Sequence, residues 1–126
     1  MTIVPGLRAE VLIMVERGDT AMKVGSGDVP VLGTPRLLAF AEAATVRAVR
    51  DHLAPGQTSV GTKVTLEHRA ASPVGAHVAI SAELVQVDGR RLVFEVTATE
   101  NRRTVAVATI ERVVVDRESF LARIHY

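Results

Sequence analysis

A single helical segment followed by four segments of alternating polar and apolar residues is the pattern that most restricts how this chain can fold. The alternating segments are 59–69, 76–87, 91–100 and 104–115, and a period of two places the apolar side chains on one face of a β-strand. Asp88-Gly89, between two of them, is a typical two-residue hairpin turn. The pattern therefore predicts an antiparallel sheet in which sequence neighbours pair.

The helix is predicted over residues 35–53, because Ala54-Pro55-Gly56 is a strong stop signal. Another strand is predicted over residues 7–15, ahead of the helix. Residues 18–30 are rich in glycine and lack periodicity, so a loop with a short strand at 21–24 is predicted there. The elements thus run from strand to helix to four strands.

One long amphipathic helix needs a sheet that can bury it. A curved antiparallel β-sheet wrapped around one long central helix, which is the hot-dog fold of the α+β class, meets this need. A flat α+β sandwich is the alternative. Because 126 residues suffice for one hydrophobic core and leave no room for a second, residues 1–126 are expected to form a single domain.

Composition excludes several classes of protein. The formal net charge of +1 gives no sign of a nucleic-acid or membrane-surface binder, and no apolar run has the length of a membrane span. The apolar stretch 11–15 is too short for a signal peptide, so we expect a cytoplasmic protein. The absence of cysteine excludes thiolate sites, and the histidines lack metal-ligand spacing, so no metal is expected.

Polar residues stand where the predicted elements are apolar. On a helical wheel Glu42 falls inside the apolar arc near its edge. His68 ends the even-numbered row of the strand at 59–69, the row expected to face the core. Thr34 opens the helix, where free N–H groups create a positive potential. A buried carboxylate or imidazole is costly unless it is paired or functional, so these residues are candidates for a site.

Each candidate also has a purely structural interpretation. Glu42 at the margin of the arc can reach water or pair with an arginine. His68 can be a satisfied core residue. Thr34 followed by Pro35 is a regular helix start, in which the threonine hydroxyl caps free amides. The functional interpretation depends on finding these residues together in one short stretch of chain.

The spacing of these residues resembles that of the hot-dog acyl-CoA thioesterases, and within them the fluoroacetyl-CoA thioesterase group. The similarity runs from about residue 31 to residue 115. Its motifs are Gly33-Thr34, Glu42, Gly61-Thr62 and the segment His68-Arg69-Ala70-Ala71-Ser72-Pro73-Val74-Gly75.

The resemblance implies a role for each matching residue. Thr34, Glu42 and His68 correspond to the catalytic set, Gly61 to a glycine near the acyl group, and Arg112 to an arginine that organises the site. It also implies an acyl-CoA substrate and a homodimer or higher oligomer, with no cofactor other than the coenzyme A of the substrate itself.

One departure concerns the substrate. The specialised fluoroacetyl enzymes carry aromatic residues upstream of the threonine that form a hydrophobic lid, whereas residues 25–30 contain none here. The resemblance thus supports hydrolysis of a short or small acyl-CoA more than selectivity for fluoroacetate.

The chemistry of thioester hydrolysis suits these side chains. His68 can act as general base near neutral pH, and Glu42 can orient the imidazole, activate water or attack the carbonyl. Thr34 can be the nucleophile or a hydrogen-bonding group. The sequence leaves these routes open, together with the alternative of a non-hydrolytic hot-dog module that binds an acyl thioester or serves as a scaffold.

Overall fold

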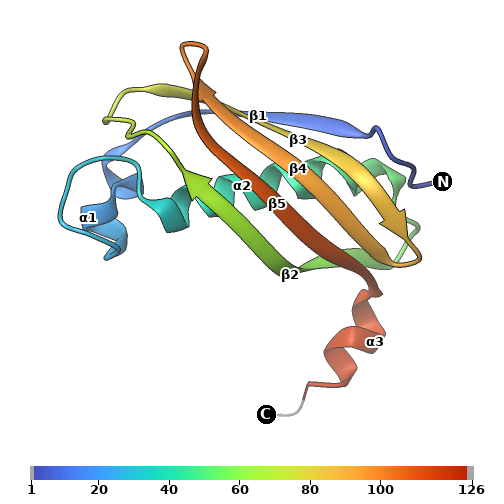
Figure 1. Ribbon diagram of the computed structural model, residues 1–126. Helices are drawn as coiled ribbons and strands as arrows, with labels where there is room; N and C mark the ends of the chain where they lie inside the picture. Colours follow the sequence, from blue (N-terminus) through green and yellow to red (C-terminus); the bar gives the residue numbers. More distant parts are fainter. Residues whose placement is uncertain (1, 125–126) are drawn as a thin grey trace.

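The computed structural model describes residues 2–124, which contain a five-stranded antiparallel sheet in the order β1-β3-β4-β5-β2 (Figure 1). The strands are β1 (Arg8–Met14), β2 (Gln57–His68), β3 (His77–Asp88), β4 (Arg91–Glu100) and β5 (Arg103–Asp116). The predicted strands are confirmed within a few residues at their ends, and the sequence neighbours β3, β4 and β5 pair as expected.

Helix α2 (Thr34–Val49) lies along one face of this sheet (Figure 1). A 3₁₀ turn, η2 (Arg50–His52), continues it, so the helical segment begins one residue earlier and ends one residue earlier than predicted. Its buried side chains are Leu37, Ala41, Ala44, Thr45, Ala48 and Val49. They face the buried sides of the strands, as the predicted antiparallel sheet around a helix requires.

Helix α2 does not cover the sheet evenly. It packs chiefly against β1 and β3, at one side of the sheet, and contacts β2 much less. The core-facing side chains of β2, such as Val64 and Leu66, are therefore only partly buried. The inner surface near β2 is the open side of the fold.

The prediction that the even-numbered side chains of β2 face the core is correct for only part of the strand. Val64 and Leu66 face the core, but a β-bulge at Thr62 shifts the register between Gly61 and Lys63. Before the bulge the odd-numbered residues therefore face inward. Gly61, predicted to face outward, lies opposite the inward-facing Arg112. The extra residue of a bulge inverts the alternation that a regular strand would keep.

The segment between β1 and α2 contains the 3₁₀ turn η1 (Arg17–Asp19) and the short helix α1 (Ala21–Val24). The strand predicted at 21–24 is wrong, because the Thr20 side chain accepts a hydrogen bond from the Lys23 N–H and Gly25 ends the turn with a positive φ of 80°. Isolated bridges join Thr20 to Leu32 and Val31 to Pro73, so the segment is held on both sides.

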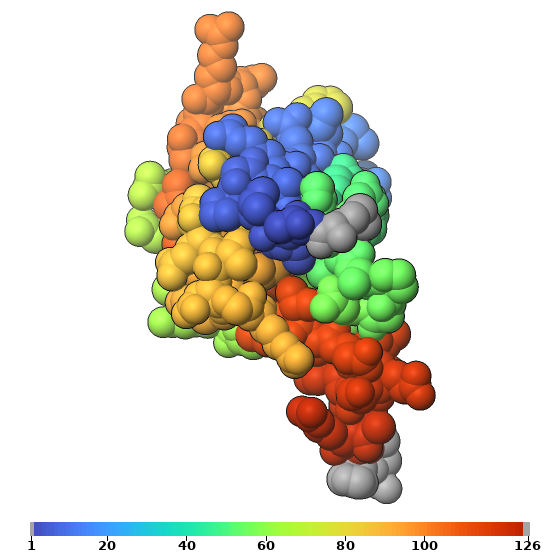
Figure 2. Space-filling view, turned by 90° about the vertical axis from the view of Figure 1, so that its right-hand side faces the viewer, coloured from blue at the N-terminus to red at the C-terminus, as the bar shows by residue number. Residues whose placement is uncertain are grey.

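The residues after β5 form the short helix α3 (Arg117–Ala122), which projects from the end of β5 and protrudes from the body of the molecule (Figure 2). Its Leu121 is 53% exposed. Among residues 2–124, no helix has the length and apolar character needed to cross a membrane.

Candidate active site

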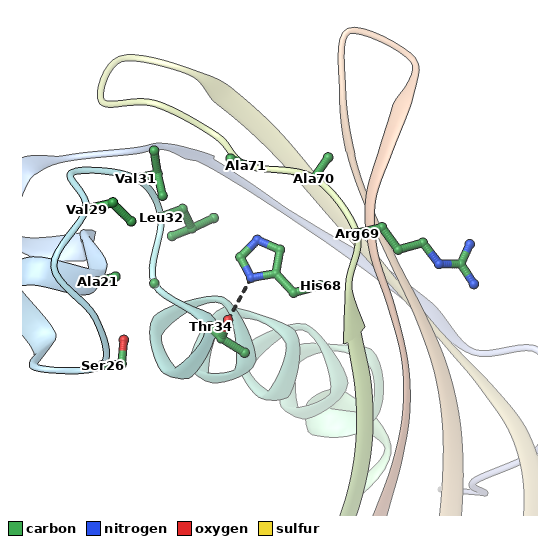
Figure 3. Close-up of a pocket in the computed structure, with 11 residues that line it drawn as sticks. Ala21, Ser26, Val29, Val31, Leu32, Thr34, His68, Arg69, Ala70 and Ala71 are labelled. Atoms are coloured by element: carbon green, nitrogen blue, oxygen red, sulfur yellow. Dashed lines mark hydrogen bonds between the residues drawn. The ribbon is translucent and has the colours of Figure 1, made fainter.

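Thr34 and His68, predicted from separate elements, meet at the start of α2. The Thr34 Oγ1 lies 2.8 Å from the His68 Nδ1 (Figure 3). The expectation that the Thr34 hydroxyl caps the helix is wrong. Gly33 is the N-cap, with extended backbone angles of φ −76° and ψ 142°, and no side chain caps the helix. Thr34 is already helical, so its hydroxyl is directed at the imidazole instead.

A cleft of about 280 Å³ opens beside this pair. In Figure 3, Val29, Val31 and Leu32 come from the segment before α2 and Ala70 and Ala71 from the segment after β2. The backbone of Arg69 borders the cleft, but its side chain points away. The described lining contains no phenylalanine or tyrosine. The cleft is therefore walled mainly by small and aliphatic side chains.

The start of α2, which borders this cleft at Gly33 and Thr34, has backbone N–H groups that the helix does not use. The first N–H to bond within the helix is that of Leu37, which donates to the Gly33 carbonyl. The earlier N–H groups of Thr34 and Arg36 have no partner within the helix, and Pro35 has no N–H. Free amides at a helix N-terminus carry partial positive charge and stabilise a negative oxygen.

The two ring nitrogens of His68 have different surroundings. Nδ1 faces Thr34, whereas Nε2 is buried by the chain and has no hydrogen-bond partner among the described residues. This burial lowers the pKa of His68 below 6.5, and a contact with the Ala70 backbone opposes the effect in part. A lowered pKa keeps the imidazole neutral at pH 7, which is the form able to accept a proton.

Glu42 and Arg112 form a second pair, on the open side of the fold. Arg112 Nη1 lies 3.3 Å from Glu42 Oε2. The remaining guanidinium donors bind Ser59, with 2.9 Å from Nε to Oγ and 3.0 Å from Nη2 to the carbonyl oxygen. Burial lowers the pKa of Arg112, and the charge of Glu42 opposes that change. The side chain of Arg112 is 8% exposed and that of Glu42 36%, so the carboxylate reaches solvent.

Gly61 makes room for this carboxylate. It lies opposite Arg112 in the β2–β5 ladder. A Cβ atom on residue 61 would lie 2.5 Å from Glu42 Oε2, closer than a nonbonded contact allows. Only glycine at this position leaves the Glu42 carboxylate where it is.

The predicted residues thus form two pairs rather than one cluster. Glu42 follows Thr34 by eight residues, which separates them by about 12 Å along a helix rising 1.5 Å per residue. No hydrogen bond or ion pair joins Glu42 to Thr34 or His68 within residues 2–124. Ser59 was missed, because regular alternation placed it on the outer face. Gly61 was the one sequence signal of a bulge.

Residues 15–118 match the family described as fluoroacetyl-CoA-specific thioesterase. The chain belongs to this family. A fluoroacetyl-CoA thioesterase from Streptantibioticus cattleyicolor is 38% identical to it over 94 residues, which is 75% of this chain and 68% of that protein. The recognition of the family from the spacing of its motifs is confirmed.

Solved structures agree with this assignment. The crystal structure of the fluoroacetyl-CoA thioesterase FlK is 32% identical, with a TM-score of 0.90 over 98% of this chain and 96% of that chain. A hot-dog-like protein from Thermanaerovibrio acidaminovorans is 24% identical, with a TM-score of 0.87 over 94% of this chain and 88% of that chain, and shares the fold. The predicted hot-dog fold is confirmed.

Metal ligands do not cluster in the part of the chain that the structure describes: residues 2–124 contain no group of three or more histidine, aspartate or glutamate side chains placed to hold an ion.

The lowered pKa of His68 predicts how stability depends on pH. Unfolding returns the imidazole to a pKa of about 6.5, so the folded state binds the proton less tightly. The stabilisation from His68 is complete above pH 6.5 and is lost as pH falls through the lower, folded pKa. An NMR titration should place the midpoint of His68 below 6.5. Lowering the pH from 7 to 5 should reduce the free energy of unfolding, measured with urea, more for the wild type than for His68→Gln. Equal reductions in the two proteins would contradict the prediction.

Proposed function

We propose that this protein hydrolyses the thioester of a small acyl-CoA to the free acid and coenzyme A. The observation that carries the proposal is the Thr34–His68 pair at the start of α2, beside a cleft, in a chain of the thioesterase family. The cleft volume of about 280 Å³ supports a short acyl group. A coenzyme A thioester is an intracellular metabolite, in agreement with the expected cytoplasmic location.

In the first route Thr34 is the nucleophile. Neutral His68 accepts the hydroxyl proton at Nδ1 while Oγ1 attacks the thioester carbonyl. The free N–H groups of Thr34 and Arg36 stabilise the oxyanion. The C–S bond then breaks, the leaving thiolate of coenzyme A takes the proton from His68, and water hydrolyses the acyl-threonine. In the second route water attacks the carbonyl and gives its proton to Thr34 Oγ1, which passes its own proton to His68 Nδ1. The C–S bond breaks and the thiolate of coenzyme A takes the proton from His68. Both routes use side chains, backbone N–H groups and water.

The geometry narrows the role of Glu42. The sequence allowed Glu42 to orient the imidazole of His68, but Nδ1 already binds Thr34 and Nε2 is covered by its own chain. We therefore assign Glu42 to activating water or attacking the carbonyl, with Arg112 holding its carboxylate in place. An acyl-threonine trapped by mass spectrometry would favour Thr34 as nucleophile, and an anhydride on Glu42 would favour direct attack.

We further propose a two-fold dimer that pairs the edge strand β2 with its copy. β2 has a neighbour on one side only, and the inner surface beside it is poorly covered by α2. A second copy would satisfy the free backbone groups of the edge and cover that surface. The resemblance implies that Thr34 and Glu42 of one subunit meet His68 across the interface or close to it, and Thr34 already meets His68 within one chain. Glu42 of the partner subunit is proposed to complete the cleft.

The direct test is release of free thiol from a panel of acyl-CoA esters, including acetyl-, fluoroacetyl-, butyryl- and palmitoyl-CoA. The proposal expects turnover of short esters and little turnover of palmitoyl-CoA. If calorimetry showed that the protein binds these esters but no thiol were released, the proposed hydrolysis would be wrong and the non-hydrolytic binding module would be favoured.

Substitutions test the catalytic set. His68→Ala and Glu42→Ala should each lower kcat by about 10²-fold or more, the range typical of a positioned acid or base. Their double variant should lose little beyond the worse single variant, because groups acting together are non-additive. Thr34→Ser should retain much of the activity and Thr34→Ala should lose it. Since Thr34 caps no amide, Thr34→Ala should unfold at nearly the wild-type temperature; wild-type turnover by this variant would exclude a catalytic Thr34.

Gly61→Ala tests the space beside Glu42. The added methyl group should displace the carboxylate and lower kcat by roughly tenfold or more, while stability changes little because a flexible side chain yields. Gly18→Ala is the matched control, since a Cβ at residue 18 has no atom within 4 Å. Equal activity of both variants would show that the position of Glu42 is unimportant.

A mixed dimer tests whether Glu42 acts in the cleft of its partner. One subunit carries Glu42→Ala and the other His68→Ala, with different affinity tags for purification. If Glu42 completes the opposite cleft, one site keeps both residues and about half the wild-type activity should return. If Glu42 serves its own chain, both sites are defective and activity should stay near that of the single variants. A monomer by light scattering, with full activity, would exclude the shared site.

A further inference from the structure

Asp19 is a buried carboxylate that the proposed reaction does not use. Only 6% of the residue is exposed. Its Oδ1 accepts a hydrogen bond from the Arg36 Nε at 2.7 Å and its Oδ2 accepts one from the Glu16 N–H at 2.9 Å. Burying a carboxylate is costly, and these charge-assisted bonds offset part of that cost.

The backbone of Asp19 binds the residue that precedes Thr34. The Asp19 carbonyl accepts the N–H of Gly33 at 2.9 Å. Gly33 is also closely packed, since a Cβ there would lie 3.0 Å from Val24 Cγ2 and 3.1 Å from backbone atoms of Ala21. Asp19 thus fixes the point at which the chain enters α2.

The side chain of Asp19 binds the first turn of the same helix. Arg36 follows Thr34 by two residues, and its guanidinium carbon lies 4.6 Å from the centre of the Phe40 ring. The Asp19 carboxylate and this ring hold Arg36 from two directions. Asp19 therefore binds the chain at Gly33, immediately before Thr34, and at Arg36, two residues after it.

The His68 side of the cleft is tied to the same segment. The Leu32 N–H donates to the Ser72 carbonyl at 2.8 Å, and Val31 bridges Pro73. Segment 31–33 is thus held between Asp19 on one side and the chain after His68 on the other. The placement of this segment sets the distance from the Thr34 hydroxyl to the imidazole.

We propose that Asp19 is a positioning residue for Thr34, acting through the Gly33 N–H and the Arg36 side chain to keep Oγ1 within hydrogen-bond reach of His68 Nδ1. This inference rests on the proposed hydrolysis, in which that bond carries the proton transfer. A displacement of a reacting group by 1 Å can lower the rate about 10²-fold. Contacts that hold the chain on both sides of Thr34 are therefore expected to raise kcat.

The test compares Asp19→Asn and Arg36→Met with the wild type. Both should lower kcat about tenfold or more and change KM less than about threefold, because the substrate cleft stays and the proton transfer is misaligned. Their double variant should resemble the worse single variant. Arg8→Met is the matched control: it breaks the exposed Arg8–Glu83 pair of 2.8 Å and should leave kcat unchanged.

A spectroscopic readout separates positioning from general destabilisation. In long-range ¹H–¹⁵N spectra the His68 Nδ1 signal should move in Asp19→Asn and Arg36→Met, measured on folded protein, and stay in place in Arg8→Met. Wild-type kcat and an unchanged Nδ1 signal in folded Arg36→Met would overturn the proposal. Arg36 is 44% exposed in its side chain, so that variant decides the matter if Asp19→Asn does not fold. If the wild type hydrolyses no ester, the proposed function fails and the Nδ1 signal alone decides this inference.

Discussion

The burial of one rigid helix against a curved sheet is the constraint on which the site depends. Because α2 buries a continuous apolar face, its position along the sheet is fixed, and with it the places of Thr34 and Glu42. A helix keeps residues eight apart about 12 Å from each other. Thr34 therefore lies at the helix start beside His68, and Glu42 lies two turns later beside Arg112.

The two pairs meet different electrostatic demands. At the helix start, free amides and a neutral imidazole surround Thr34, so negative charge that develops there is stabilised. Two turns later a buried guanidinium needs a counter-charge, which Glu42 supplies while Ser59 takes the other donors. Such a buried ion pair contributes little net stability, because desolvation offsets the attraction. Its value is in fixing the direction of a carboxylate that reaches solvent.

Much of this arrangement could be predicted from sequence, because periodicity reports which face of an element is buried. The order of the elements, the antiparallel pairing and the inward side of Val64, Leu66 and His68 all follow from it. The helix boundary at Gly33 did not follow, since Thr-Pro fits both a cap and a first helical residue. Asp19 was also missed. Its partners lie in separate segments, and a short polar turn gives no periodicity to place it.

The bulge at Thr62 allows β2 to contribute a residue to each of the two pairs of the site. Gly61 and His68 are seven residues apart, and in a regular strand an odd separation places two residues on opposite faces. One extra residue returns both to the inner face. The same strand can then leave space for the Glu42 carboxylate near its middle and present an imidazole to Thr34 at its end. In a strand with strict alternation, either Gly61 or His68 would face outward and its contact would be lost. The bulge in β2 therefore allows one edge strand to contribute to both pairs.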